Sequence, residues 1–166
     1  RPEWATWLSN TAKMPAVLGV LALACGMAWV QHGRAAVLLP AVAYLGAQGV
    51  NLALRALIFV PRPDATLVQV AAASADSGLP STFALVYAAV FGVMLTNVER
   101  HKSAHLALAA TAAGLILVGC VARIALGGHW PSQLAASALF ALGATRLFTT
   151  QWLNRSSQIR ASRRLG

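Results

Sequence analysis

Five apolar runs, separated by short polar segments, constrain this chain more than any other feature. They cover approximately residues 14–30, 35–60, 81–98, 104–126 and 132–148. Each run is close to the length of about 20 residues that a helix needs to cross a hydrocarbon core of about 30 Å. Only 10% of the residues are charged, whereas a soluble domain carries about 25% and its helices need a charged outer face. The pattern therefore predicts an all-α integral membrane helical bundle with about five transmembrane helices.

The two ends of the chain differ from these runs. Trp4, Trp7 and Lys13 precede the first run, and aromatic rings beside a charge are typical of a helix that lies in the membrane interface. The alternative is that this segment is the end of a sixth span that begins before Arg1. We therefore divide the chain into an N-terminal interfacial segment, a transmembrane domain and a basic cytoplasmic tail, at residues 1–13, 14–148 and 149–166.

The net charge is +9, from 13 Lys and Arg against 4 Asp and Glu. We expect no nucleic-acid partner, because the basic residues lie at the ends of apolar runs, where anionic lipid headgroups and topology control account for them. Five crossings place one large basic group on a single side, and the positive-inside rule makes that side cytoplasmic. This group consists of Arg34, Arg100, Lys102, Arg146, Arg155, Arg160, Arg163 and Arg164.

A second basic group opposes that topology signal on the outer side. Apart from Arg1 and Lys13, it consists of arginines at span ends, where a guanidinium is costly: about 2.5–3.5 kcal/mol for a central Arg. We expect a shared anionic ligand to offset this cost. Ser81 opens the third run as a predicted N-cap with free backbone N–H groups, and His129 lies in a turn on the same side. The three arginines are Arg55, Arg62 and Arg123, and the first two would share one face of a continued helix.

The spacing of these residues forms three motifs. The chain reads Arg55, six residues, Arg62-Pro63; then Pro80-Ser81-Thr82-Phe83; then Ala122-Arg123, five residues, His129, three residues, Gln133. In order and spacing this resembles the type 2 phosphatidic acid phosphatase (PAP2) superfamily, which includes vanadium haloperoxidases. The family signature is Lys, six residues, Arg-Pro; then Pro-Ser-Gly-His; then Ser-Arg, five residues, His, three residues, Asp.

The resemblance implies a role for each matching position. His129 would be the nucleophile that takes the phosphoryl group, and the phosphate would be held by Ser81 and by Arg55, Arg62 and Arg123. Phe83 stands where the family has the histidine that protonates the leaving group, and a phenyl ring cannot donate a proton. Gln133 stands where the family has the aspartate that orients the nucleophile, although its carbonyl can still accept the imidazole N–H. No metal or cofactor is expected, because arginines neutralise the phosphate charge.

Two functions follow, and both stay open from the sequence. The first is a protein that binds a lipid phosphate or polyprenyl (di)phosphate headgroup at its outer face, with reduced or no phosphatase activity, or a structural subunit with membrane protein partners. The second is an active lipid-phosphate phosphatase or phosphotransferase that uses His129, with another group as the acid. Asp64 and Asp76 are the nearby carboxylates. We expect a bacterial inner membrane, with the site facing the periplasm and the C-terminus in the cytoplasm.

Overall fold

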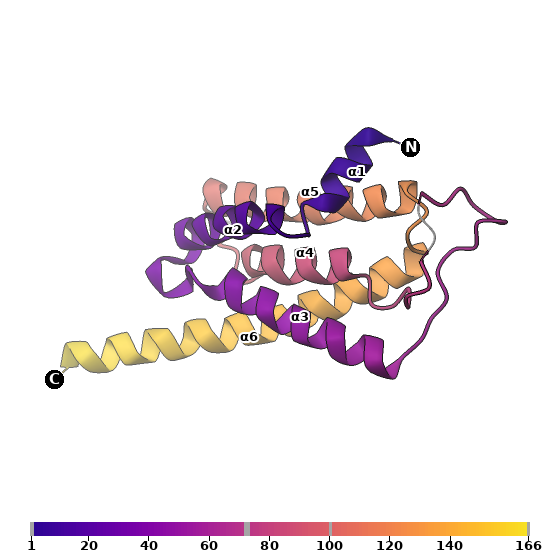
Figure 1. Cartoon of the computed structure of the whole chain (residues 1–166). Helices are drawn as coiled ribbons and strands as arrows, with labels where there is room; N and C mark the ends of the chain where they lie inside the picture. The colour runs from indigo at the N-terminus through magenta and orange to yellow at the C-terminus, as the bar shows by residue number, and fades with distance from the viewer. Residues whose placement is uncertain (1, 72–73, 100, 166) are drawn as a thin grey trace.

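The computed structural model describes residues 2–71, 74–99 and 101–165, and its regular elements are all helices. No strand occurs within these ranges, and the all-α prediction is confirmed. Arg1 and Arg100 lie outside the described residues, as do the side chains of Arg160, Arg163 and Arg164. The elements (Figure 1) are α1 (Glu3–Asn10), α2 (Ala16–His32), η1 (Arg34–Ala36), α3 (Leu39–Leu57), α4 (Thr82–Gly92), η2 (Val93–Leu95), α5 (Ser103–Ala125) and α6 (Pro131–Leu165).

Helix α4 is the centre of the bundle. Every residue from Phe83 to Gly92 is buried, and α4 packs chiefly against α3, α5 and α6 (Figure 1). A helix that is apolar on all sides needs such an enclosed position. The other helices therefore surround α4, and the start of α4 lies at the same end of the bundle as the last turns of α3 and α5.

The second apolar run forms a shorter helix than predicted. Helix α3 ends at Leu57, and Ile58 is already extended, because a residue before proline disfavours the helical conformation and Pro61 follows closely. The backbone of Val60 pairs instead with the loop before α4: its N–H donates to Ser77 Oγ at 3.1 Å, and its carbonyl accepts the N–H of Gly78 at 2.7 Å. The helix therefore does not continue to Arg62, and Arg55 and Arg62 do not share one helix face.

The lengths of the other helices also differ from the prediction. The third run was expected to extend to residue 98, but η2 ends at Leu95, Thr96 is already extended, and Asn97 has a positive φ of 52°. Two described helical segments are long and apolar enough to cross a membrane, namely Arg34–Leu57 and Ser103–Ala125, whereas α2 and Thr82–Leu95 are apolar but shorter. Five transmembrane helices therefore stay a prediction.

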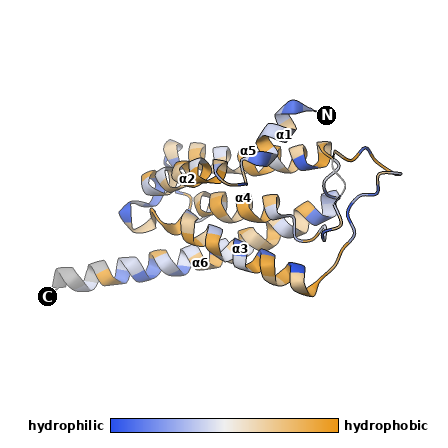
Figure 2. Cartoon of the chain, in the orientation of Figure 1, coloured by the Kyte–Doolittle hydropathy of each residue, from blue (hydrophilic) through white to orange (hydrophobic). Residues whose placement is uncertain are grey.

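Helix α6 is continuous across the predicted boundary between the last span and the basic tail. It runs as one α-helix from Pro131 to Leu165, and its C-terminal part extends beyond the rest of the bundle (Figure 1). The hydrophobic residues of the chain cover the helices within the bundle, and this projecting part is largely hydrophilic (Figure 2). The change at residue 149 is thus one of composition, with no break in the backbone.

Helices α4 and α5 are in tight contact at Gly119. The ring of Phe83 lies where a Cβ at position 119 would be, and the same ring stacks on Tyr87 with 4.2 Å between ring centroids. Gly114, one and a half turns earlier on α5, has no atom within 4 Å of its own Cβ position. Gly119 therefore makes the room that the Phe83 ring occupies.

We expect Gly119→Ala to lower the free energy of unfolding by about 1–3 kcal/mol, because the added methyl group overpacks the contact with Phe83. Gly114→Ala is the matched control on the same helix, and it should be neutral or stabilise by up to about 1 kcal/mol, since alanine favours the helix and meets no neighbour. Chemical unfolding in detergent micelles measures both. Equal effects of the two substitutions would contradict the close approach.

Candidate phosphate site

A polar cavity of about 220 Å³ lies at the end of the bundle where α3 and α5 end and α4 begins. Arg55, Arg62, Arg123 and His129, which come from separate parts of the chain, all line it together with Phe83. Ser81 and Gln133 are not among the residues that line it. The remaining lining residues are Ser9, Ala12, Lys13 and Thr82.

Arg55 is positioned by a group of polar side chains on α3 and α4. Its Nε donates to Asn51 Oδ1 at 3.2 Å, one helical turn earlier, and its Nη2 donates to Thr82 Oγ1 at 3.2 Å. Asn51 is buried, and its Oδ1 also accepts a hydrogen bond from the Thr82 hydroxyl at 3.0 Å. This triad orients the guanidinium at the end of α3 toward the cavity.

Arg62 joins the loop after α3 to the turn before α6. Its Nε donates to the carbonyl of Asp76 at 3.0 Å, and its Nη1 donates to the carbonyl of Gly128 at 3.1 Å. The same Nη1 lies 3.5 Å from Nε2 of His129. The loop thus places a guanidinium beside the imidazole although no helix connects them.

Arg123 enters the cavity from the last turn of α5. Its Nη1 donates to Ser9 Oγ at 2.7 Å, and its Nε is buried without a partner among the described residues. A Cβ at position 128 would lie 2.8 Å from Nη2 of Arg123, so Gly128 leaves the space that this guanidinium occupies. A buried N–H without a partner is costly, and a ligand oxygen in the cavity would satisfy it.

His129 is 4% exposed and has a defined orientation. Its Nδ1 lies 2.9 Å from the carbonyl of Gly78, so Nδ1 carries the proton and Nε2 presents a lone pair toward Arg62 and the cavity. Burial and then the positive charges of Arg123 and Arg62 lower the pKa of His129 from 6.5 to about 4. At neutral pH the imidazole is therefore uncharged, which is the form that can act as a nucleophile.

Gln133 does not take the role that its position in the motif suggested. Its Oε1 accepts the backbone N–H of Trp130 at 3.1 Å, and its Nε2 donates to the carbonyl of Pro61 at 2.8 Å. The carbonyl of Gly78 lies 2.9 Å from the imidazole Nδ1, so a backbone group makes the orienting contact, and Gln133 lies close enough to raise the pKa of His129 as well. Gln133 instead connects the start of α6 to the loop after α3.

Ser81 is also placed differently from the prediction. It is fully buried, makes no N-cap hydrogen bond, and its backbone N–H donates to Ser137 Oγ at 2.8 Å. The Ser81 hydroxyl is buried without a partner among the described residues, and the hydroxyl that lines the cavity belongs to the next residue, Thr82. Thr82 is therefore a candidate phosphate ligand that the motif did not single out.

Neither of the nearby carboxylates lines the polar cavity. Asp64 accepts hydrogen bonds from the N–H and hydroxyl of Thr66 at 2.8 and 2.9 Å, and Asp76 accepts one from Ser74 at 3.3 Å. Both residues are exposed. The described residues also contain no group of three or more His, Cys, Asp or Glu side chains with metal-binding geometry.

Sequence reasoning missed four polar residues around the cavity. Asn51 could have been predicted from the sequence, because it is a polar residue in an apolar run and lies one helical turn before Arg55. Thr82 belongs to the same motif as Ser81, but the sequence does not show which of the two hydroxyl groups faces the cavity. Lys13 was assigned only to the basic group of the outer side, and Ser9 had no signal, because the presence of both at the cavity depends on the way α1 packs on α5.

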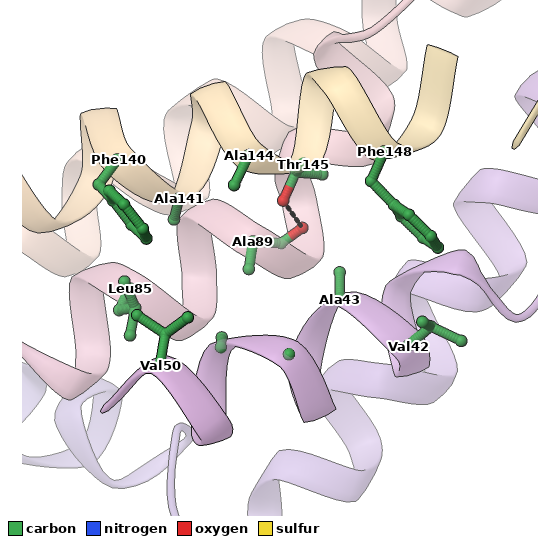
Figure 3. A pocket seen from close by; sticks show the side chains of 12 residues that line it. Val42, Ala43, Val50, Leu85, Ala89, Phe140, Ala141, Ala144, Thr145 and Phe148 are labelled. Atoms are coloured by element: carbon green, nitrogen blue, oxygen red, sulfur yellow. Dashed lines mark hydrogen bonds between the residues drawn. The ribbon is translucent and has the colours of Figure 1, made fainter. Parts of the chain in front are cut away.

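A larger cavity of about 300 Å³ is almost entirely apolar and lies elsewhere, between α3, α4 and α6 (Figure 3). Val42 and Val50 of α3 face Phe140 and Phe148 of α6 across it, and Ala89 of α4 lies between them. No ionisable side chain lines this cavity. It offers space for an apolar group and has no group that could bind phosphate.

The family comparison agrees with the motifs and with this geometry. The family model of the PAP2 superfamily matches residues 36–157. The chain belongs to the PAP2 superfamily. The matched region of this PAP2 protein contains Arg55, Arg62, Arg123 and His129, and it excludes α1 and most of the residues before α3. No curated protein and no solved structure matches the chain significantly.

The lowered pKa of His129 predicts a pH dependence of stability. A folded-state pKa of about 4, below the ordinary 6.5, means that the unfolded chain binds the proton more readily, so stability is lost as pH falls from 6.5 toward 4. At about 1.36 kcal/mol per pKa unit, His129 accounts for about 3 kcal/mol of this loss. Unfolding in phosphate-free buffer at pH 7 and pH 4, compared with His129→Gln, measures it. An equal loss in both proteins would contradict the assignment.

Proposed function

We propose that this PAP2 protein is an integral membrane protein that binds the phosphate headgroup of a lipid phosphate or polyprenyl (di)phosphate at its outer face, with reduced or no phosphatase activity. One observation carries the proposal: three arginines and an uncharged imidazole line one cavity, and a phenyl ring lines it where the family has its acid. Arg55, Arg62, Arg123 and Thr82 would hold the phosphate oxygens. Guanidinium groups are well suited to phosphate because they offer paired N–H donors.

The character of the bundle surface supports a membrane location. Large apolar side chains such as Leu45, Leu117 and Leu139 are about two-thirds exposed on three different helices. A soluble bundle would carry charged residues on these outer faces. Family membership and the two long apolar helices agree with this location. A bacterial inner membrane, with the site toward the periplasm, is the orientation that the distribution of basic residues favours.

The apolar cavity supports a lipid rather than a water-soluble ligand. It follows α3 as far as Val50, and the next residue is Asn51, which holds Arg55 and Thr82. An alkyl chain in this cavity would therefore begin close to the polar site on the same helix. Because α3 and α6 make few contacts with each other, the space between them needs an apolar filling.

The active-enzyme alternative is favoured by a specific observation, namely the orientation of His129. Its Nε2 lone pair is directed into the cavity beside Arg62, and its Nδ1 is paired with Gly78. This is the arrangement of a nucleophile. The missing part is a proton donor for the leaving alcohol, and general acid catalysis is typically worth about 10²–10⁴ in rate.

One experiment separates the two functions. The purified protein in nanodiscs is given phosphatidic acid or a polyprenyl diphosphate, and both binding and phosphate release are measured against a His129→Ala variant. We expect binding to both lipids and phosphate release no faster than from His129→Ala. Faster release that depends on His129 would establish the phosphatase, and binding no stronger than to phosphatidylcholine would remove the proposed function.

A further inference from the structure

A second polar cavity adjoins the phosphate site. Its volume is about 290 Å³, and Ser9, Lys13, Arg62 and Arg123 line both cavities. On its far side it is lined by polar residues of α1, Thr6 and Asn10. The two arginines therefore lie between two spaces that can each hold a small polar group.

Helix α1 is held firmly enough to form a wall of this second cavity. Ala5 is fully buried and packs against Ala122 of α5 and Leu126 just after it, and Ser9 accepts the hydrogen bond from Arg123 at 2.7 Å. The hydroxyl of Thr11, just after α1, also pairs with the hydroxyl of Tyr87 at the centre of the bundle. Because α1 lies outside residues 36–157, its polar residues are an addition to the region that matches the family.

The two cavities together hold more positive charge than one phosphate monoester can neutralise. Lys13, Arg55, Arg62 and Arg123 line them, and no carboxylate does. Among the residues that the structure describes, none of these four cations forms an ion pair. Four unpaired cations around connected cavities repel one another, and this arrangement is favourable only when a multiply charged anion is bound.

We propose that α1 and the turn after it complete a second phosphate subsite, so that the site is built for a diphosphate group. This inference rests on the proposed function and names the ligand class of that same site. One phosphoryl group would lie beside Arg55 and His129, and the other beside Asn10 and Lys13. Arg62 and Arg123, which line both cavities, would contact both groups.

Comparing the binding of monophosphate and diphosphate forms of the same ligand tests the second subsite. Binding of inorganic phosphate and of pyrophosphate to the full chain in nanodiscs is compared, and then binding of a polyprenyl monophosphate and the matching diphosphate. We expect the diphosphate form to bind about 10-fold more tightly in each pair, which corresponds to one added charge-assisted contact. Comparison of the free anions with the lipid-borne pair shows whether the headgroup alone is sufficient for the preference for diphosphate.

Substitutions assign the preference to α1. Thr6→Ala/Asn10→Ala should remove the preference for diphosphate and leave monophosphate affinity within about 3-fold, because these two residues line only the second cavity, whereas Arg55→Ala should weaken both ligands. Lys102→Ala, at the opposite end of the bundle and paired with Glu99, is the matched control and should change neither. Circular dichroism and unfolding of each variant verify that α1 remains folded on the bundle.

The possible failures are distinguishable. Equal affinity of the unchanged protein for monophosphate and diphosphate, or equal weakening of both ligands by Thr6→Ala/Asn10→Ala, would overturn the second subsite and leave the proposed function intact. If no phosphate or diphosphate binds in free or lipid-borne form, both proposals are overturned together.

Discussion

Replacing Phe83 with histidine is expected to raise the rate of phosphate release from a lipid monophosphate by about 10²-fold. A positioned general acid is typically worth about 10²–10⁴ in rate. We expect the low end of this range, because the cations around the cavity lower the pKa of a histidine there and reduce the fraction that carries the proton to be donated. Phosphate release from phosphatidic acid in mixed micelles is the measurement.

The structure allows this substitution without rearrangement of the backbone. Phe83 already lines the cavity with Arg55 and His129, and its ring occupies the space beside Gly119. An imidazole is smaller than a phenyl ring and fits the same space. The loss of stacking on Tyr87 would be expected to cost about 0.5–1.5 kcal/mol of stability, which does not prevent folding of a stable domain.

Two controls isolate the added acid. Phe83→Leu opens the cavity without a proton donor and should not raise the rate, and Phe83→His combined with His129→Ala should abolish the gain. Adding Gln133→Asp should bring no further increase, because Gln133 bonds to Trp130 and Pro61 and the carbonyl of Gly78 already pairs with the imidazole Nδ1. An equal rise with Phe83→Leu would show that access to the cavity, and not acid catalysis, limits the rate.

Replacing Arg123 with alanine is expected to weaken the binding of phosphatidic acid by about 10–100-fold. A hydrogen bond to a charged group is worth about 1.5–3 kcal/mol, and each 1.4 kcal/mol is a factor of ten in affinity. Arg123 has a buried Nε without a partner among the described residues, so its capacity for a phosphate oxygen is unused by the protein itself. Titration of nanodiscs with phosphatidic acid measures the affinity.

Arg146→Ala is the matched control for this prediction. Arg146 is an exposed arginine on α6, fifteen positions after Pro131 and so about four turns from the end of the helix nearest the site. Its loss removes the same charge from the protein without touching the cavity, and affinity should stay within about 2-fold. Phosphatidic acid binding that survives Arg123→Ala unchanged would exclude Arg123 from the phosphate clamp.

The results with Phe83 and Arg123 bear on different halves of the site. Loss of binding with Arg123→Ala tests whether the cations hold phosphate, and gain of turnover with Phe83→His tests whether His129 is positioned to attack it. A protein that binds and gains turnover is a family member in which the phosphate clamp has been kept while the acid has been lost. A protein that binds phosphate but gains no turnover has a phosphate clamp in which His129 is not positioned to attack the phosphorus atom.

The sequence by itself determined the fold class, the family and the end of the bundle where the basic residues meet. Long apolar runs can only form helices in lipid, and consecutive antiparallel helices return to the same end at every second connection. Arg55, Arg62, Arg123 and His129 therefore had to lie at one end once the runs were recognised. The spacing within the three motifs was then sufficient to identify the PAP2 superfamily.

Only the tertiary structure decided which side chains face the cavity. Ser81 and Gln133 do not line the cavity, and Gln133 bonds to Trp130 and Pro61. The carbonyl of Gly78 orients His129, and a backbone group leaves no signature in a motif. Side-chain direction depends on contacts between segments far apart in sequence, whereas the position of a helix end depends on the local run of residues; for that reason the sequence located the site and the packing selected its members.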